Sequence, residues 1–160
     1  MLLANTEVRQ RLDRARLADL VRVAASAGEW AGLVRYTEGA RWYQRLERGE
    51  NHEVWLLSWL PGQRTGFHDH CGSSGAFTVV QGELRERTLA AGHPAPVAAA
   101  FPAGRVRSFG PRHVHEVVNE TAAPAVSIHA YSPPLAGMRR YELTGRGLVL
   151  AAVETAGERW

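Results

Sequence analysis

The spacing of apolar and polar residues changes once along this chain, close to residue 40. Up to about residue 35, apolar residues recur every three to five positions with Arg and Asp between them, which is typical of an amphipathic helix. Thr6 is the predicted N-cap, and Gly28 is predicted to divide the run into a longer and a shorter helix. The apolar positions are Val8, Leu12, Leu17, Leu20, Val21 and Ala24. We therefore expect a helical cap over residues 1–38.

After residue 40 the period becomes two, in short runs rich in β-branched and aromatic residues, which is typical of strands. Glycines and prolines separate the runs, "VVQGEL" around Gly82 is interpreted as a hairpin turn, and "AAGHPAPVAAA" as a surface loop. The predicted strands are "RWYQRLER", "EVWLLSWL", "AFTVVQGELRERTL", "RVRSFG", "VHEVVNE", "AVSIHAYS" and "RRYEL". This pattern favours an all-β sandwich or barrel over residues 40–155, within a single domain of residues 1–160.

Composition narrows the class of protein. With 160 residues, 45% of them hydrophobic and 22% charged, the chain fits an ordinary globular protein. No apolar run approaches the roughly 18 residues that span a bilayer, and the start turns polar too early for a secretory signal. All 19 basic residues are Arg, interleaved with acidic ones, so we expect no nucleic-acid partner. A cytoplasmic enzyme or binding protein without membrane contact is the expectation.

The candidate chemistry begins at "GFHDHC", where His68 and His70 lie two positions apart. In a strand, such side chains point to one face and provide half of a metal site. A pair of solvent-facing histidines beside a loop is the alternative. Asp69, between them, is expected to point away from a metal, and Cys71 is the single cysteine, which excludes an intramolecular disulfide and a zinc site with two cysteines.

The surrounding spacing resembles the two motifs of the cupins, which are small double-sheet jelly rolls with a metal inside one end. Residues 62–82 match the first motif, except that Gly75 replaces its glutamate. Residues 104–119 match the opening glycine and the H-x3-N end of the second, but lack its proline and second glycine. The resemblance implies an all-β cupin with an N-terminal helical segment. Its metal ligands would be His68, His70 and His115.

Three neutral imidazoles would leave the full charge of a divalent metal for incoming ligands. Such a site favours an anionic, chelating substrate, and a thiolate is a natural candidate. Zinc with three histidines is also reasonable, so the ligands alone do not determine the metal. The remaining histidines, His52, His93 and His113, are expected to be solvated in loops or turns.

Several longer stretches resemble the cysteine dioxygenases, specifically their shorter bacterial members. They are "YQR" at 43–45, "WLPGQRTGFHDHCGSSGAF", "QGELRE", "HEVVN" and "PAVSIHAYSPP". The resemblance implies an enzyme of cysteine catabolism with one Fe(II) per chain, which adds both atoms of O2 to the sulfur of L-cysteine. The product would be cysteine sulfinic acid. A cis Ser132–Pro133 bond is also implied.

The resemblance also assigns roles to residues outside the metal site. Arg45 matches the arginine that binds the substrate carboxylate, and Tyr43 matches its neighbour at the pocket. Ser127, His129 and Tyr131 match a chain of hydrogen-bonding residues beside the iron, and their alternation along one strand fits a shared face.

One departure from the family is clear. Animal members join a cysteine to the tyrosine as a thioether, and that cysteine position is Gly75 here. We therefore expect an unmodified Tyr131 and a free Cys71. Arg45 and Met138 match the cysteine-oxidising branch rather than the branch that oxidises 3-mercaptopropionate. The alternatives are a dioxygenase of another small thiol, such as 3-mercaptopropionate or cysteamine, or a non-catalytic metal-binding cupin.

Overall fold

The structure, a computed structural model, describes residues 10–156. It begins with helix α1 (Arg14–Ala27) and the 3₁₀ turn η1 (Glu29–Gly32), and continues in strands to its end. The strands are β1 (Trp42–Arg48), β2 (Glu53–Trp59), β3 (Phe67–Asp69), β4 (Ser74–Gln81), β5 (Glu83–Thr88), β6 (Val97–Pro102), β7 (Val106–Phe109), β8 (Glu116–Val118), β9 (Ala125–Ser132), β10 (Gly137–Thr144) and β11 (Gly147–Thr155). The predicted all-β architecture with an N-terminal helical segment is confirmed.

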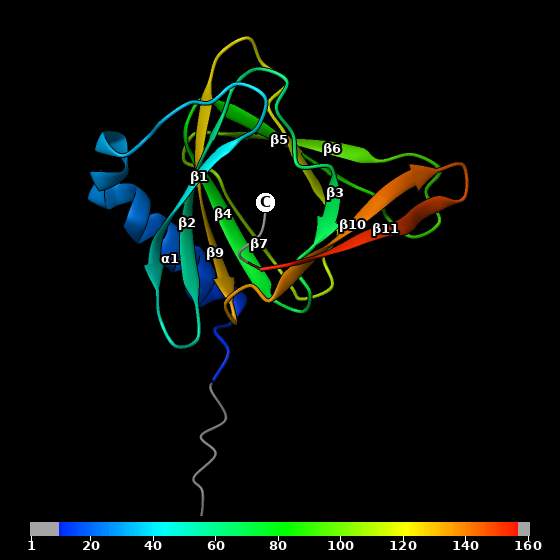
Figure 1. Ribbon diagram of the computed structural model, residues 1–160, viewed down its shortest axis with the longest axis horizontal. Coiled ribbons are helices and arrows are strands. Elements are labelled where there is room, and N and C mark those ends of the chain that lie inside the picture. Colours follow the sequence, from blue (N-terminus) through cyan, green and yellow to red (C-terminus); the bar gives the residue numbers. More distant parts are fainter. Residues whose placement is uncertain (1–9, 157–160) are drawn as a thin grey trace, which may run out of the picture.

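The strands form three antiparallel sheets around one interior, as Figure 1 shows. The largest has the order β1-β2-β9-β4-β7, and the two smaller ones have the orders β11-β10-β3 and β6-β5-β8. Two isolated bridges, Arg64–Val118 and His68–His115, connect the smaller sheets to each other. Hydrogen bonds among the described strands do not close the sheets into a barrel, so of the two architectures expected, the sandwich-like one is present.

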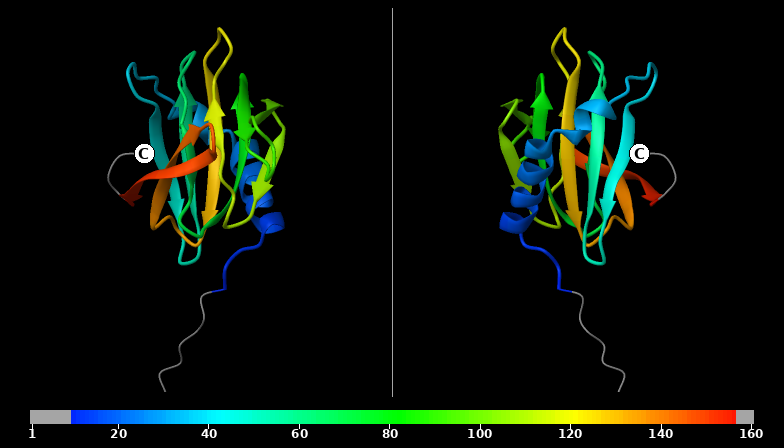
Figure 2. Two further views of the ribbon diagram at one scale, coloured as in Figure 1. Left: turned by 90° about the vertical axis from the view of Figure 1, so that its right-hand side faces the viewer. Right: turned by 90° about the vertical axis from the view of Figure 1, so that its left-hand side faces the viewer.

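Helix α1 covers the outer face of the five-stranded sheet, as both views of Figure 2 show. The predicted N-cap, Thr6, lies outside the described residues. The helix instead begins after Asp13, whose carboxylate accepts a 2.8 Å hydrogen bond from the amide of Arg16, and it ends at Gly28 with φ of 74°. Leu17 and Val21 are fully buried against the sheet. None of the helices in residues 10–156 is long and apolar enough to cross a membrane.

Strand β9 lies between two apolar clusters, because its side chains point alternately to the two faces of the sheet. Its even-numbered members Val126, Ile128 and Ala130 pack in the cluster beneath α1. Its odd-numbered members Ser127, His129 and Tyr131 therefore face the interior between the sheets, and all eight residues of the strand are buried. A strand in the middle of the largest sheet thus brings a polar row into an apolar interior. After it, the Ser132–Pro133 bond is cis, as the resemblance implied.

Three expectations about strands are wrong. The predicted loop at residues 90–100 ends in β6, which pairs with β5, and β11 was not predicted at all. Gly82 is not a hairpin turn, because β4 and β5 do not pair with each other and belong to different sheets. Gly82 has φ of 75°, and a Cβ there would lie 2.7 Å from the carbonyl oxygen of Pro124. The glycine therefore lets the chain pass from one sheet to the next beside a close backbone neighbour.

Gly75 allows another close approach, because it lies opposite both Tyr131 and Phe109 in the five-stranded sheet. A Cβ at this position would lie 2.5 Å from Cζ of Phe109 and 3.1 Å from Cδ1 of Tyr131. The buried Phe109 ring stacks on His70 and His113, at centroid distances of 5.1 and 4.8 Å, so it has little freedom to withdraw. Phe109 therefore takes the space that a side chain at position 75 would need.

This packing predicts that Gly75→Ala lowers the free energy of unfolding by about 1–3 kcal/mol, because the methyl group overpacks the interior. Urea denaturation measures the change. Combining Gly75→Ala with Phe109→Leu should cost less than the sum of the two single changes, since the smaller side chain removes the clash. Wild-type stability in Gly75→Ala would contradict the close contact.

Candidate functional site

A small cavity lies between the sheets. Its free volume of about 40 Å³ compares with the roughly 10–15 Å³ that one buried water requires, so it takes a ligand of a few heavy atoms. The lining side chains come from Arg41, Tyr43, Trp55, Leu57, Thr65, His68, His115, Val117, His129, Tyr131, Leu135, Met138 and Arg140. Apolar and aromatic residues thus surround a few polar groups, the usual composition of a small-molecule site.

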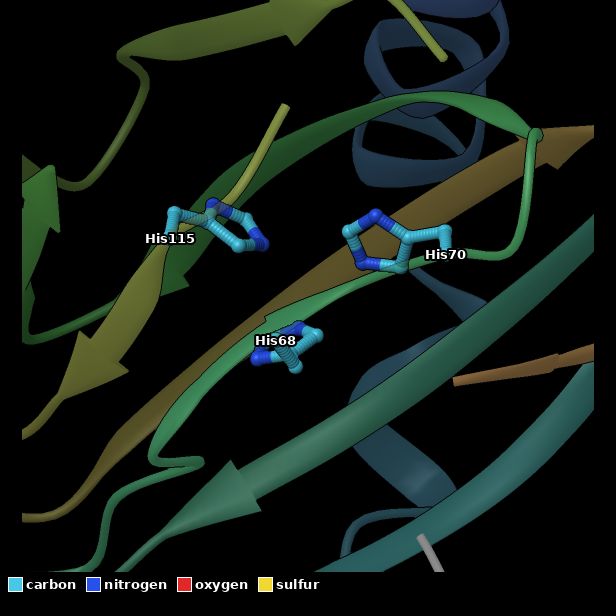
Figure 3. A group of neighbouring side chains, drawn as sticks. All are labelled: His68, His70 and His115. Carbon is cyan, nitrogen blue, oxygen red and sulfur yellow. The ribbon is translucent and has the colours of Figure 1, made fainter. Parts of the chain in front are cut away.

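The predicted metal ligands His68, His70 and His115 come together, and Figure 3 shows their rings around a common space. Of the three, His68 and His115 line the cavity. Their ring centroids lie 4.7 to 5.2 Å apart, and each offers a nitrogen within 4.8 Å of the other two. His68 and His115 also exchange two backbone hydrogen bonds, of 2.9 and 3.0 Å. The same bridge that joins the smaller sheets therefore brings these two side chains together.

Hydrogen bonds at the other ring nitrogen orient two of the imidazoles. His68 Nδ1 donates to the carbonyl oxygen of Gly66 at 2.9 Å, and His115 Nδ1 donates to Glu86 Oε1 at 2.9 Å. In a neutral ring the proton is then on Nδ1, and Nε2 has a free lone pair. His70 Nε2 is buried and has no hydrogen-bond partner within residues 10–156.

Burial keeps these imidazoles neutral. It lowers the pKa of His68 and His70 well below the ordinary value, and the pKa of His115 also falls because burial outweighs the effect of Glu86. Neutral imidazoles with free lone pairs are the form that binds a metal. The unpartnered, buried Nε2 of His70 is the atom that a metal ion would satisfy, so the three residues fit a metal.

Glu86 is a residue that the sequence analysis did not identify. Its Oε1 accepts hydrogen bonds from His113 Nε2 at 2.8 Å and from His115 Nδ1 at 2.9 Å, and its Oε2 lies 2.8 Å from Arg107 Nε. Burial would raise the pKa of this carboxyl, but the two histidines and Arg107 outweigh burial and hold the pKa far below the ordinary range. His113 is therefore a partly buried partner of Glu86 and not the solvated residue that was expected.

Glu86, His113 and His115 form a second group close enough to hold a metal. Arg107 already supplies a positive charge beside Glu86, which would repel a further cation. All three members of this group are also engaged in mutual hydrogen bonds, whereas the group of three imidazoles contains an unpartnered nitrogen. The three imidazoles are therefore the better metal site, with Glu86 supporting one of them from behind.

A directed chain of hydrogen bonds runs along the inner face of β9. Trp59 Nε1 can only donate, and it lies 2.8 Å from Ser127 Oγ, so the serine accepts. Ser127 is then free to donate to His129 Nε2 at 2.8 Å, and His129 Nδ1 donates to the Tyr131 hydroxyl at 3.3 Å. Burial lowers the pKa of His129 to about 3 and raises the pKa of Tyr131 above its ordinary value. Tyr131 thus keeps its own proton, which it can donate into the cavity.

Of the two predicted substrate residues, one lines the cavity and the other does not. Tyr43 lines the cavity, with its ring edge-on to Trp55 at 6.0 Å. Arg45 is not among the lining residues: its side chain is 43% exposed, its guanidinium lies 5.6 Å from the Trp55 ring centre, and Nη1 lies 3.9 Å from the Glu53 carboxylate. Arg41 and Arg140 line the cavity instead. Arg45 as a carboxylate-binding residue stays a prediction.

Asp69 points away from the three imidazoles, as expected. Its carboxylate accepts hydrogen bonds from the Tyr141 hydroxyl at 2.7 Å and from the amide of Cys71 at 3.0 Å, and Cys71 is a free cysteine. Sequence reasoning missed two residues: Arg41, which lines the cavity, and Glu86, which accepts a hydrogen bond from His115. Arg41 precedes Tyr43 by two positions, and Glu86 follows the buried Leu84 by two, so strand alternation places each on an inward face.

The support from Glu86 predicts that Glu86→Gln weakens divalent-metal binding by roughly 10- to 100-fold, because the carboxylate orients His115 and increases its basicity. Competition with a chromophoric chelator measures the affinity without reference to activity. The matched control is Glu116→Gln, another buried glutamate, whose carboxylate pairs with Arg87 at 2.6 Å and with Arg64 at 3.6 Å instead of with a histidine. Equal affinities for the two variants would contradict the role of Glu86.

The buried imidazoles also predict how stability depends on pH in the metal-free protein. Below pH 6.5 these histidines bind fewer protons in the folded protein than in the unfolded chain. Their contribution to the free energy of unfolding is therefore complete above pH 6.5. For His129 it falls as the pH drops toward the folded-state pKa of about 3. His129 alone should lower the free energy of unfolding by about 2 kcal/mol at pH 5, relative to pH 6.5 and above. Urea unfolding between pH 7 and 5 should therefore show a steeper loss for the wild type than for His129→Gln. Parallel pH profiles would contradict the neutral, buried state of His129.

Solved structures with this fold come from several bacteria. The TT1209 protein of Thermus thermophilus has a TM-score of 0.58 at 23% identity, over 66% of this chain and 95% of that one. A Klebsiella pneumoniae protein with a double-stranded β-helix domain has a TM-score of 0.59 at 21% identity, over 76% of this chain and 93% of that one. An RmlC-like cupin protein of Desulfovibrio desulfuricans has a TM-score of 0.54 at 19% identity, over 64% of this chain and 91% of that one. At these identities the likeness shows the fold alone, which is that of the cupins.

Sequence comparison gives the family. No curated protein matches the chain. The sequence profile of "Cysteine dioxygenase type I" matches residues 6–144, which includes the three clustered imidazoles and the row of polar residues on β9. This match covers well over half of the chain, and the chain belongs to the cysteine dioxygenase type I family.

Proposed function

We propose that this protein is an iron(II)-dependent thiol dioxygenase whose substrate is L-cysteine and whose product is cysteine sulfinic acid. His68, His70 and His115 would hold one iron per chain. The observation that carries the proposal is the position of three neutral imidazoles, one with an unpartnered buried nitrogen, beside the hydrogen-bonded row that ends at Tyr131. Membership of the family supports the reaction class.

The overall reaction joins one thiol and one O2. Both oxygen atoms become bonded to sulfur, the sulfur is oxidised, and O2 is reduced, so no further oxidant or reductant is needed. When bound, iron(II) supplies the electron transfer that lets O2 react with a thiolate. With three neutral ligands, the site favours an anionic sulfur over a neutral one.

The chain's own residues would orient the reactants and exclude water. Tyr131 would donate its hydroxyl proton to an electronegative atom in the cavity, because His129 already satisfies one lone pair of its oxygen. Ser127 and Trp59 hold His129 in the tautomer that makes this possible. Trp55, Leu57, Leu135 and other apolar lining residues keep the volume small and dry, which strengthens each polar contact inside it.

The substrate carboxylate needs a cation, because burying it without one is costly. The family resemblance assigns this role to Arg45 with Tyr43 beside it. Tyr43 lines the cavity, whereas Arg45 would have to turn inward from the edge and leave Glu53. Tyr43 therefore belongs to the proposed substrate site as it stands, and Arg45 would join it only after this movement.

The direct test is mass analysis of the product after anaerobic loading with iron(II) and addition of L-cysteine under labelled O2. Cysteine sulfinic acid carrying two labelled oxygen atoms is the expected product. Oxygen uptake without a sulfinic acid, or a product with one labelled atom, would overturn the proposal. Parallel reactions with 3-mercaptopropionate and cysteamine identify another thiol as the preferred substrate, if one is oxidised faster.

Two histidine variants test the metal ligands within the same assay. His68→Ala should abolish iron binding and activity, because it removes one imidazole of the proposed site. His113→Ala should bind iron and retain activity at least in part, because His113 belongs only to the second group. The opposite pattern would assign the metal to Glu86, His113 and His115.

A further inference from the structure

Three buried side-chain nitrogens within residues 10–156 have no hydrogen-bond partner: Trp55 Nε1, His70 Nε2 and Arg107 Nε. His70 Nε2 is the atom that the proposed metal would satisfy. Arg107 Nε lies 2.8 Å from Glu86 Oε2, so a carboxylate compensates its charge even without a well-aligned hydrogen bond. The indole N–H of Trp55 is left without an acceptor in this part of the chain. Because buried donors in native proteins are nearly always paired, this N–H requires a partner that the described residues do not supply.

Trp55 borders the cavity. Val54, its neighbour on β2, packs in the cluster beneath α1, so alternation directs Trp55 and Leu57 to the interior, where both line the cavity. In the five-stranded sheet Trp55 lies directly opposite His129, the middle member of the polar row on β9. Directly opposite residues of an antiparallel pair share a face. The unpartnered indole therefore lies beside the row that leads to Tyr131.

The other indoles with known partners behave differently. Trp59, four positions further along the same face of β2, donates to Ser127 at 2.8 Å. Trp30 donates to the carbonyl oxygen of Ala25 at 3.1 Å. Away from the cavity wall that Trp55 forms, these buried or partly buried indole donors find an acceptor in the protein. A phenylalanine at position 55 would cover the cavity without an unpaired donor, so the indole nitrogen indicates a ligand acceptor at this wall.

The chemistry of the donor limits what that acceptor can be. An indole N–H only donates, so it cannot serve an ammonium group, and it needs an oxygen or another lone pair. The clustered imidazoles belong to β3, to the turn after it and to the residue before β8, whereas Trp55 belongs to the largest sheet. A thiol bound by its sulfur near the imidazoles would thus present its other end to a different wall. In a short amino or carboxylic thiol, the acceptor at that end is a carboxylate oxygen.

We propose that Trp55 is a specificity-determining residue, whose indole N–H donates a hydrogen bond to one carboxylate oxygen of the thiol substrate. The inference rests on the proposed function. The donor is uncharged and points in a single direction, so it orients the carboxylate and supplies no counter-charge. Its contribution is therefore separate from that of any arginine at the site. A hydrogen bond to a charged acceptor is stronger than one between neutral groups, which gives this single contact a measurable share of the affinity.

The experiment compares Trp55→Phe with the wild type in equilibrium binding of thiols to the iron(II)-loaded protein without O2, by calorimetry. The variant should bind L-cysteine roughly 10- to 150-fold more weakly, the value of one hydrogen bond to a charged group. It should lose a similar factor for 3-mercaptopropionate, which has the carboxylate but no amine. Cysteamine, which has the amine but no carboxylate, should bind both proteins equally.

Trp30→Phe is the matched control, because it makes the same change at an indole outside the cavity lining. It should bind all three thiols as the wild type does, and iron content should be equal in the three proteins. Equal losses for cysteine and cysteamine in Trp55→Phe would show that the indole only packs, and unchanged cysteine binding would show that water satisfies the N–H. Either result would overturn the inference.

A spectroscopic measurement follows the N–H itself. Ultraviolet resonance Raman spectra of the wild type minus those of Trp55→Phe isolate the signal of this indole. Its N–H-sensitive band should move toward stronger hydrogen bonding when cysteine is added, and should stay in place with cysteamine. A band that does not respond to cysteine, or that responds to both thiols alike, would contradict the proposed contact.

The same samples separate this inference from the proposed function. If the wild type oxidises cysteine and Trp55→Phe binds cysteine normally, only the inference about Trp55 fails. If the wild type neither binds nor oxidises cysteine while loaded with iron, the proposed function fails and the inference fails with it.

Discussion

The backbone bridge between His68 and His115 is the contact on which this structure most depends. Two hydrogen bonds, of 2.9 and 3.0 Å, join a residue of β3 to the residue that precedes β8. They connect the two smaller sheets, and the side chains of the same two residues line the cavity and form a close group with His70. The fold and the candidate metal site are therefore fixed by one contact, so that a change in one sheet's position would separate the imidazoles.

Burial determines the electrostatics around that bridge. The three clustered imidazoles and His129 lose water, remain neutral and retain lone pairs, while charged groups are arranged in pairs behind or beside them. Glu86 is held ionised by Arg107 and two histidines, and Arg140 is held by Glu154.

Much of this arrangement could be predicted from the sequence, because strand alternation determines which side chains share a face. It predicted that His68 and His70 point together and that Ser127, His129 and Tyr131 form one row. It could not predict Glu86 beside His115, since that contact depends on the pairing of β5 with β8. Arg41 follows the same alternation as Tyr43, but 19 arginines in the chain hid the signal.

The errors in the fold have similar causes. The alanine-rich β6 has little strand propensity of its own and is a strand because it pairs with β5 along its whole length. A glycine between β4 and β5 is typical of a hairpin turn, but here the close backbone of Pro124 requires it. Local pattern therefore predicted the strands with strong alternation and missed those that long-range pairing creates.

The most direct test of this account is an anomalous difference map from crystals of the iron(II)-loaded protein, recorded at the iron absorption edge. The account predicts one peak at about 2.0–2.2 Å from Nε2 of His68, His70 and His115, by analogy with zinc–histidine distances. A peak held by Glu86 and His113 would contradict it.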